Sequence, residues 1–236
     1  VRKRLDLLKG GGLARIIYPA RLIVLIISDV LEDRLDVIAS GPGYSNPTGT
    51  EDVEAIAAKY HLPVRLGNLL NKVLVQDVAM GQYKYSGEVE VFKNVHHVIL
   101  GNINTAALAA KQQALTEGFD TYLLSTSLEG EARLRGRQLA QIAHSICSPF
   151  DKLTRPRCII LGGEPTVTVT GSGVGGRNQE MALATVEYLS DLPGVIFISL
   201  ATDGGDGPTD AAGAVSTGTT YRRAIAHYMD PNKYLQ

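Results

Sequence analysis

The sequence predicts an α/β fold with a largely parallel sheet. From Val95 onward, short runs of strand length alternate with stretches of helical spacing, which is the pattern of strands joined by crossover helices. The chain has 236 residues, of which 44% are hydrophobic and 20% charged, so it can form a real core. As a prior, this length corresponds to one large or two small domains.

The expected strands are short apolar or alternating runs bounded by turn residues. Residues 22–27 form a continuous run of leucine and β-branched residues, which is typical of a strand covered on both faces. Valine and threonine alternate in residues 167–170, which we also interpret as a strand. The other expected strands are residues 97–100, 121–125, 158–161 and 195–201.

The expected helices have apolar residues at helical spacing. In residues 51–60 this spacing follows Thr50 and two acidic residues, which suit a helix N-terminus. Residues 104–117 are rich in alanine, a strong helix former. The other expected helices are residues 66–76, 130–148, 178–189 and 220–227.

Charge and composition argue against several kinds of partner. The formal net charge of -1 gives no reason to expect a nucleic acid or another polyanion. The longest strongly apolar run, residues 22–27, is far below the roughly 18 residues of a membrane span, so we expect no membrane segment and no signal peptide. Cys147 and Cys158 do not form a disulfide framework and indicate reduced, partly buried thiols of a cytoplasmic protein.

Most of the predicted strands end in loops of glycine with acidic, amide or hydroxyl side chains. In open parallel sheets ligands bind beyond these strand ends, and glycine lets a ligand approach backbone N–H groups. Ser28 and Asp29 follow the first strand, and a carboxylate at such a place commonly faces a ligand. Because no G-x-x-x-x-G-K-[ST] loop occurs, a P-loop NTPase is excluded.

Residues 171–176 form a glycine loop in which Gly171, Gly173 and Gly176 have G-x-G-x-x-G spacing. A lone match of this kind is a weak indication of dinucleotide binding. The alternating strand before it and the Arg-Asn-Gln-Glu helix start after it both disfavour that function. Arg177 beside a glycine-rich helix start suits direct binding of phosphate or carboxylate, and the alternative is a glycine turn with a surface arginine.

Asp203, Asp206 and Asp210 lie in a second glycine-rich loop. Their spacing does not fit an EF-hand, but such carboxylates can hold Mg²⁺ together with phosphate oxygens, or one can accept a hydroxyl proton. The alternative is that aspartates simply favour caps and turns. One further set of charged residues is interpreted as a solvated helix face: Glu131, Arg133, Arg135 and Arg137.

Six motifs, taken in order, resemble the type II glycerate kinases, whose C-terminal half is called the MOFRL domain. They span nearly the whole chain, which makes the resemblance specific. The motifs are residues 27–30 (ISDV), 37–42 (VIASGP), 130–133 (GEAR), 162–167 (GGEPTV), 175–180 (GGRNQE) and 201–213 (ATDGGDGPTDAAG).

The resemblance implies ATP- and Mg²⁺-dependent phosphorylation of D-glycerate, usually to 2-phosphoglycerate. It also implies two α/β domains with largely parallel, Rossmann-like sheets, helices on both faces and an active site in the cleft between the domains. Catalytic roles are implied for Arg177, Asp203 and Asp206, the two aspartates also being candidate Mg²⁺ ligands. The implied substrate- or nucleotide-binding residues are Ser28, Asp29, Ser40, Gly41, Glu164, Gly173, Gly175, Gly176, Asn178, Thr202, Gly204 and Gly205.

The chain departs from the family pattern at both ends. Family members are longer, and their lysine-bearing segment, Ser-Gly-Gly-Gly-Ser loop and closing Thr-Gly-Thr-Asn pattern do not occur here. We therefore expect a fragment in which residues 1–86 are the C-terminal part of the first domain and residues 94–236 belong to the second. The MOFRL portion is expected over residues 156–236, truncated at its C-terminus.

Two other functions remain open. The G-x-G-x-x-G match supports an NAD(P)H-dependent hydroxypyruvate reductase, a name that some relatives carry. Such an enzyme needs an acidic residue at the end of the next strand to hold the ribose. Asp203 is near that place but lies somewhat beyond the predicted end of the strand, so this test is not decisive. The missing N-terminal loop supports a catalytically incomplete module that binds a nucleotide or a sugar acid. The sequence leaves open whether the protein forms a homodimer.

Overall fold

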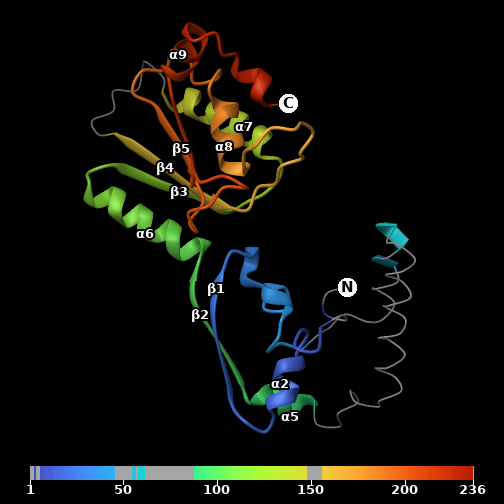
Figure 1. Cartoon of the computed structure of the whole chain (residues 1–236). Coiled ribbons are helices and arrows are strands. Elements are labelled where there is room, and N and C mark those ends of the chain that lie inside the picture. The colour runs from blue at the N-terminus through green and yellow to red at the C-terminus, as the bar shows by residue number, and fades with distance from the viewer. Residues whose placement is uncertain are drawn as a thin grey trace. The chain divides into compact units, whose positions relative to one another are not determined.

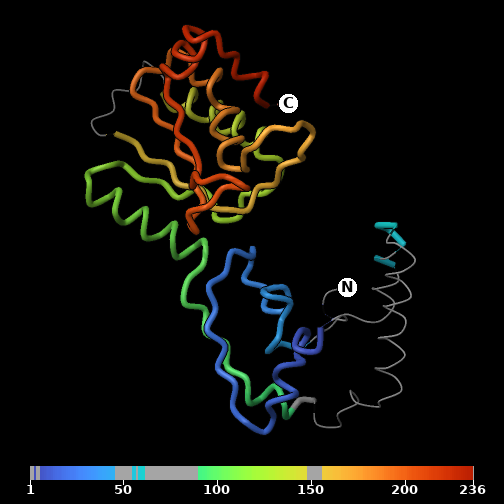
Figure 2. Tube along the Cα trace, viewed as in Figure 1, coloured from blue at the N-terminus to red at the C-terminus, as the bar shows by residue number. Residues whose placement is uncertain are grey.

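The computed structural model describes residues 3, 6–45, 55–56, 58–61, 88–147 and 156–235. The chain divides into two compact units, Val1–Ala106 and Ala107–Gln236 (Figures 1 and 2). Both units combine helices with strands, which confirms the predicted α/β class. The predicted helix over residues 66–76, and half of that over residues 51–60, lie outside the described residues. Within the second range, residues 55–56 and 58–59 are helical.

The first unit is built on β1 (Leu22–Ser28) and β2 (Val95–Asn102), which pair in parallel. Leu22 lies opposite Val95 at one end of the pair, and Ser28 lies opposite Asn102 at the other. Both strands therefore direct their carboxyl ends to the same edge, where the polar residues predicted from the sequence are found. The described residues of this unit also form α2 (Gly12–Ile17), the 3-10 turns η1 (Leu31–Asp33) and η2 (Ile38–Ser40), and α5 (Glu88–Lys93).

The prediction that residues 22–27 are covered on both faces is wrong for this structure. Ile26 is buried, whereas Ile23, Leu25 and Ile27 are 60%, 64% and 83% exposed. Successive side chains of a strand point to opposite faces, and here one of the two faces of β1 is largely uncovered. The continuous apolar run thus predicted the strand correctly but not the burial of its two faces.

In the second unit, β3 (Asp120–Leu128) and β4 (Arg157–Gly163) form a parallel pair. β5 (Ile196–Leu200) and β6 (Gly213–Thr217) form an antiparallel pair. β6 was not predicted, because its five residues follow a glycine-rich loop and its strand character depends on pairing with β5. The helices are α6 (Ile103–Thr116), which begins in the first unit, α7 (Ala132–Ile146), α8 (Arg177–Thr185) and α9 (Thr220–Ala226), and the 3-10 helix η3 (Pro231–Leu235) closes the described chain.

The core of the second unit lies around α8, which contacts α7, β5 and β6. Small residues let α7 and α8 approach closely: a Cβ on Gly136 would lie 2.3 Å from the carbonyl oxygen of Met181. Ala140 on α7 and Leu189 after α8 are fully buried. This packing fixes the axis of α8, and so the place where that helix begins.

Residues 167–170 are not a strand, which corrects the sequence prediction. The residue before this segment, Thr166, makes an isolated bridge to Glu131. The Thr168 N–H donates to the Glu131 carboxylate at 2.6 Å, so a side chain takes the place of a neighbouring strand. Alternation of valine and threonine is compatible with extended backbone, and only the tertiary partner decides whether a ladder forms.

The division into units differs from the domain boundary expected at residues 86–94. β2 pairs with β1 and is grouped with the first unit, so the contacts divide the chain at Ala106. The predicted domain ranges stay a prediction.

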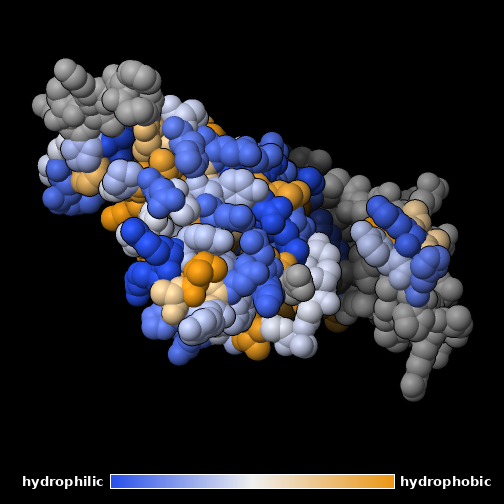
Figure 3. Space-filling view, turned by 90° about the horizontal axis from the view of Figure 1, so that it is seen from above, coloured by the Kyte–Doolittle hydropathy of each residue, from blue (hydrophilic) through white to orange (hydrophobic). Residues whose placement is uncertain are grey.

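The surface carries no long apolar helix among the described segments. None of their helices is long and apolar enough to cross a membrane. The face seen in Figure 3 shows small hydrophobic patches among hydrophilic residues. Both cysteines are free. Cys158 is partly covered as predicted, whereas Cys147 is exposed, so the prediction of partial burial is wrong for Cys147.

Candidate functional site

The N-terminus of α8 is capped by a residue from a distant loop. Gly176 occupies the N-cap position, and since it has no side chain it cannot cap the helix itself. Asp206 does so instead: its carboxylate accepts the N–H of Asn178 at 3.0 Å and the N–H of Gln179 at 2.8 Å. The two glycine-rich loops are therefore joined at the start of α8.

Side chains complete the enclosure of Asp206, which is only 1% exposed. The amide of Asn178 donates to one carboxylate oxygen at 3.1 Å, and the amide of Gln179 donates to the other at 3.2 Å. Burial by itself raises the pKa of Asp206, but the backbone and side-chain hydrogen bonds from these two residues outweigh it and lower the pKa below its ordinary value. Asp206 is thus held as a buried carboxylate.

This cap bears on the dinucleotide interpretation of the glycine loop. In that motif the pyrophosphate lies at the helix N-terminus and uses its free N–H groups. Here Asp206 already takes the N–H groups of Asn178 and Gln179. Together with the missing strand before the loop, this geometry disfavours a dinucleotide fingerprint.

The glycines of the two loops differ in the reason why the position is glycine. A Cβ on Gly176 would lie 2.4 Å from Cγ of Asp206, and one on Gly207 would lie 2.2 Å from the carbonyl oxygen of Gly175, so close packing requires these glycines. By contrast, a Cβ on Gly173, Gly175 or Gly205 would meet nothing within 4 Å, and none of the three has positive φ. Neither packing nor backbone conformation explains why they are glycine.

Gly204 belongs to a third case, because its φ of 85° favours glycine although a Cβ there would meet open space. It lies in the connection between β5 and β6, which is closed by a hydrogen bond from Ala201 N–H to the Ala212 carbonyl at 2.7 Å. Thr202 and Asp203 are exposed in the same connection. The Asp203 carboxylate accepts the Gly205 N–H at 3.3 Å.

Arg177 and Glu164 form an ion pair through Nη1 and Oε1. Arg177 is the first residue of α8, and Glu164 follows β4, so the pair joins the two ends of the loop that precedes the helix. The side chains are 40% and 34% exposed, which leaves the guanidinium accessible. Its remaining N–H donors suit phosphate or carboxylate oxygens.

Asn178, which was predicted to bind a ligand, has its side chain fully engaged. Its Nδ2 donates to Asp206, and its Oδ1 accepts the hydroxyl of Ser199 at 2.8 Å. Gln179 similarly donates to Thr209 at 2.9 Å. These contacts tie α8 to β5 and to the loop that follows it.

The three loop aspartates are not brought together as a metal cluster. Asp203 and Asp210 are exposed, whereas Asp206 is buried under α8. In the described segments no group of three or more histidine, cysteine, aspartate or glutamate side chains could hold a metal ion.

The predicted site residues of the first unit lie at the end of β1 and in the turn of η2. Ser28 is buried and its hydroxyl accepts the Val30 N–H at 3.2 Å, whereas Asp29 is exposed. The carbonyl groups of Ser40 and Gly41 accept N–H groups of the Gly10-Gly11 turn at 2.9 and 2.8 Å. Ser40 and Gly41 have φ values of 64° and 62°, a left-handed conformation that is unusual for serine.

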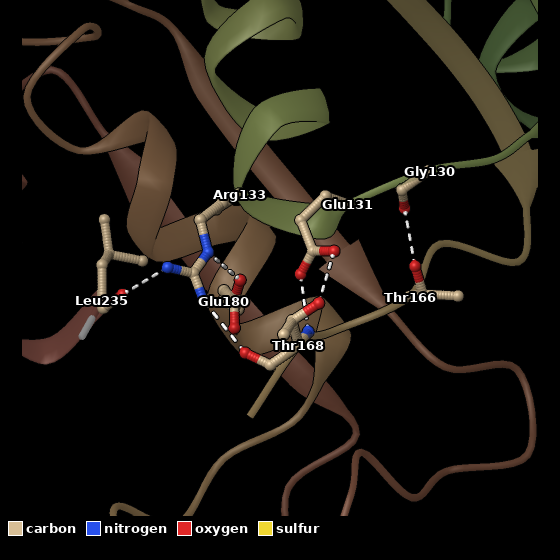
Figure 4. A network of polar contacts seen from close by, with 7 residues as sticks. All are labelled: Gly130, Glu131, Arg133, Thr166, Thr168, Glu180 and Leu235. Atoms are coloured by element: carbon tan, nitrogen blue, oxygen red, sulfur yellow. Dashed lines mark hydrogen bonds and ion pairs between the residues drawn. The ribbon is translucent and has the colours of Figure 1, made fainter. Parts of the chain in front are cut away.

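Glu131 and Arg133 are not a solvated helix face, which corrects the sequence interpretation. Both hold other segments in place, as Figure 4 shows. Glu131 accepts the Thr168 N–H and hydroxyl, and Arg133 forms an ion pair with Glu180 at 2.8 Å. The GEAR motif at residues 130–133 could have indicated this structural role, because a helix start that is only solvated does not need these particular residues.

Comparisons with known proteins identify the family to which the chain belongs. A model of the MOFRL family matches residues 157–236, and a model described as a domain of unknown function (DUF4147) matches residues 1–75. The glycerate kinase of Macaca fascicularis is 33% identical over 276 aligned positions, which cover 100% of this chain and 68% of that protein. The chain belongs to the glycerate kinase family. The resemblance inferred from the six motifs is thereby confirmed.

Bacterial relatives in the glycerate kinase family extend the match. The D-glycerate 2-kinase of Thermotoga maritima is 39% identical over 236 residues, covering 100% of this chain and 54% of that protein. The crystal structure of a glycerate kinase from Thermotoga maritima superposes with a TM-score of 0.78 at 37% identity, covering 100% of this chain and 54% of that one. The chain thus spans about half the length of these relatives.

Proposed function

We propose that the full-length protein is a glycerate kinase that transfers the γ-phosphoryl group of ATP to D-glycerate, giving 2-phosphoglycerate and ADP. The observation that carries this proposal is the junction of the two glycine loops at α8, with Arg177 and Asp203 accessible beside it. Phosphoryl transfer depends on positioning and charge neutralisation rather than on a covalent nucleophile, and these residues supply both. The relative from Thermotoga maritima carries the name D-glycerate 2-kinase.

The open glycines support contact between a phosphate group and the loop backbone. Gly173, Gly175 and Gly205 have free space where a side chain would lie, so a ligand oxygen can approach their N–H groups. Arg177 supplies a positive charge at the end of the same loop and binds either the transferred phosphoryl group or the glycerate carboxylate. Glu164 fixes the direction of the guanidinium.

The proposed Mg²⁺ fits Asp203 better than Asp206. Mg²⁺ is commonly bound through one or two carboxylates together with water and phosphate oxygens. Asp203 is exposed and accepts the Gly205 N–H, whereas both oxygens of Asp206 are engaged by α8. When bound, the ion would neutralise charge on the phosphate oxygens.

Roles for the first unit are part of the same proposal. Ser28, Asp29, Ser40 and Gly41 would contact glycerate or nucleotide, and Asp29 is the exposed carboxylate among them. We also propose that the enzyme acts in the cytoplasm, as its free cysteines suggest. Size-exclusion chromatography with light scattering would decide whether it forms the homodimer that the sequence leaves open.

The decisive assay uses the full-length gene product with Mg²⁺-ATP and D-glycerate. ADP release that depends on glycerate is the expected result, and identification of the phosphoglycerate isomer would fix the position of transfer. NADH with hydroxypyruvate is run in parallel, since oxidation of NADH without ADP release would establish the reductase instead. Binding of ATP without turnover would favour the catalytically incomplete binding module.

A further inference from the structure

One arginine outside the proposed catalytic set joins both ends of the glycine loop. The guanidinium of Arg133 donates to the carbonyl oxygen of Thr168, before the loop, at 3.3 Å. It also binds the carboxylate of Glu180, on α8 after the loop, at 2.8 Å. A third donor reaches the carbonyl oxygen of Leu235 at 2.8 Å, so a single planar group connects three segments (Figure 4).

Residues at and just before the start of α7 reinforce the hold on the upstream end. Glu131 accepts the N–H and the hydroxyl of Thr168 at 2.6 and 3.0 Å. Two backbone hydrogen bonds join Thr166 to Gly130 and Ala132 at 2.9 and 2.8 Å. The GEAR motif, to which the proposed catalytic roles assign nothing, therefore acts as a clasp, which we define as residues 130–133.

Beyond the clasp the loop projects away from the packed core. Val169 and Val174 are 79% and 74% exposed, and a side chain on Gly173 or Gly175 would meet nothing. The loop is next fixed at Gly176, which lies against Asp206. Its shape between these points depends on how far apart its two ends are held.

We propose that Arg133 is a positioning residue for Arg177 and the glycine loop. Glu180 lies three residues after Arg177, so the two side chains are neighbours on the surface of α8. By holding Thr168 and Glu180 at once, Arg133 sets the span of the loop and the direction in which Arg177 leaves the helix. The effect on catalysis rests on the proposed kinase function, whereas the effect on the loop does not.

The chemistry of the guanidinium makes the proposal specific. Its donors are fixed in one plane, which lets it serve Glu180, Thr168 and Leu235 together. A lysine keeps the positive charge but has a single ammonium group, and it cannot reproduce this geometry. Arg133→Lys therefore separates the shape of the group from its charge.

The test compares Arg133→Lys with Arg135→Lys in the full-length protein. Arg135 lies on the same helix, but its side chain binds Glu129 and Gln138 near its own turn. Hydrogen exchange is measured on peptides covering residues 165–169 and 177–180, whose amides are bound by Glu131 and Asp206. Faster exchange in both peptides for Arg133→Lys, but not for Arg135→Lys, is expected. Unchanged exchange in these peptides would overturn the proposal.

Kinetics then test whether the clasp acts through Arg177. Arg133→Lys should lower kcat/KM for glycerate phosphorylation by about tenfold, a scale typical of coupled residues. In an Arg177→Ala background the same change should have an effect of less than about twofold, because the group being positioned is gone. Equal effects in both backgrounds would mean that Arg133 contributes only to general stability.

A second variant guards against misfolding of the first. Glu180→Gln removes the charge of the ion pair but keeps an acceptor, and it should change exchange and kcat/KM in the same direction by a smaller factor. If this variant leaves both unchanged, the clasp does not act through the Arg133–Glu180 contact and the proposal fails. If the wild-type protein releases no ADP, the proposed kinase function fails, and the exchange measurements still decide whether Arg133 positions the loop.

Discussion

At the scale of single residues, Asp206 shows how a predicted catalytic aspartate can have a structural role. Its carboxylate performs the task of an N-cap side chain for α8 although it lies 28 residues from Asn178. Both oxygens accept hydrogen bonds, and the side chain is buried. The predicted metal role for this residue remains a prediction, and the geometry favours positioning.

The lowered pKa of Asp206 gives a prediction about acid stability. A carboxylate whose pKa is lower in the folded state stabilises the fold above the ordinary value of 3.8, and this stabilisation is lost as the pH falls through the lowered pKa. Asp206→Asn should therefore reduce the free energy of unfolding by about 1–3 kcal/mol at pH 7 and by less near the acid transition. Urea unfolding measures this, with the exposed Asp210→Asn as control. A pH-independent difference would contradict the assignment.

Two adjacent glycines give a prediction that separates folding from function. Gly176→Ala should cost about 1–3 kcal/mol of stability, because the new Cβ would collide with Asp206. Gly175→Ala should change stability by less than about 0.5 kcal/mol, since a Cβ there meets open space. If the loop backbone contacts phosphate, the Gly175 variant should still lower kcat/KM by about tenfold. An unchanged kcat/KM for this variant would mean that the loop is only a structural turn and does not contact phosphate.

At the scale of secondary-structure elements, α8 is the element on which the site depends. It packs against α7, β5 and β6, and its first turn meets the Asp206 loop. A buried hydroxyl pair, Thr185 on α8 and Ser216 on β6, fixes the far end of the helix against the strand. The position of Arg177 follows from these contacts rather than from its own ion pair, which is partly exposed and adds little stability.

The hydroxyl pair predicts an asymmetry between single and double substitutions. Thr185 donates to the Ala182 carbonyl at 2.7 Å, so the Ser216 hydroxyl is the donor to Thr185. Thr185→Val leaves that donor buried without its partner and should cost about 1–3 kcal/mol of unfolding free energy. Adding Ser216→Ala removes the unsatisfied group and should recover part of the loss. Thermal and urea unfolding check this, and a double variant less stable than Thr185→Val would refute it.

At the scale of the whole molecule, the residues predicted from the sequence to have functional roles are distributed over both compact units. The second unit contains both glycine loops, and the first contains Ser28, Asp29 and the Ser40-Gly41 turn. The chain covers about half of its relatives from Thermotoga maritima and Pyrococcus horikoshii, so activity is a property to measure on the full-length protein. Membership of the glycerate kinase family is what makes that measurement specific.

The metal dependence of the full reaction tests how the aspartates divide their roles. Asp203→Asn should raise the Mg²⁺ concentration for half-maximal rate by about tenfold or more, the scale for a group that supports metal binding. Asp206→Asn should leave this concentration unchanged in the fraction of protein that stays folded, because α8 engages its oxygens. Equal shifts for both variants would restore the metal role predicted for Asp206, and Asp210→Asn serves as the control.

The sequence alone determined the α/β class, most of the strands and helices, the glycine loops and the family, because these depend on local periodicity and on ordered motifs. Tertiary structure decided what local pattern does not contain. It turned residues 167–170 into a bound loop, added β6 as the antiparallel partner of β5, and placed Asp206 under α8. It also made Arg133 a link between Thr168 and Glu180. In each case the physical reason is the same: a polar group or strand edge is satisfied by a partner far along the chain, and local sequence does not specify that partner.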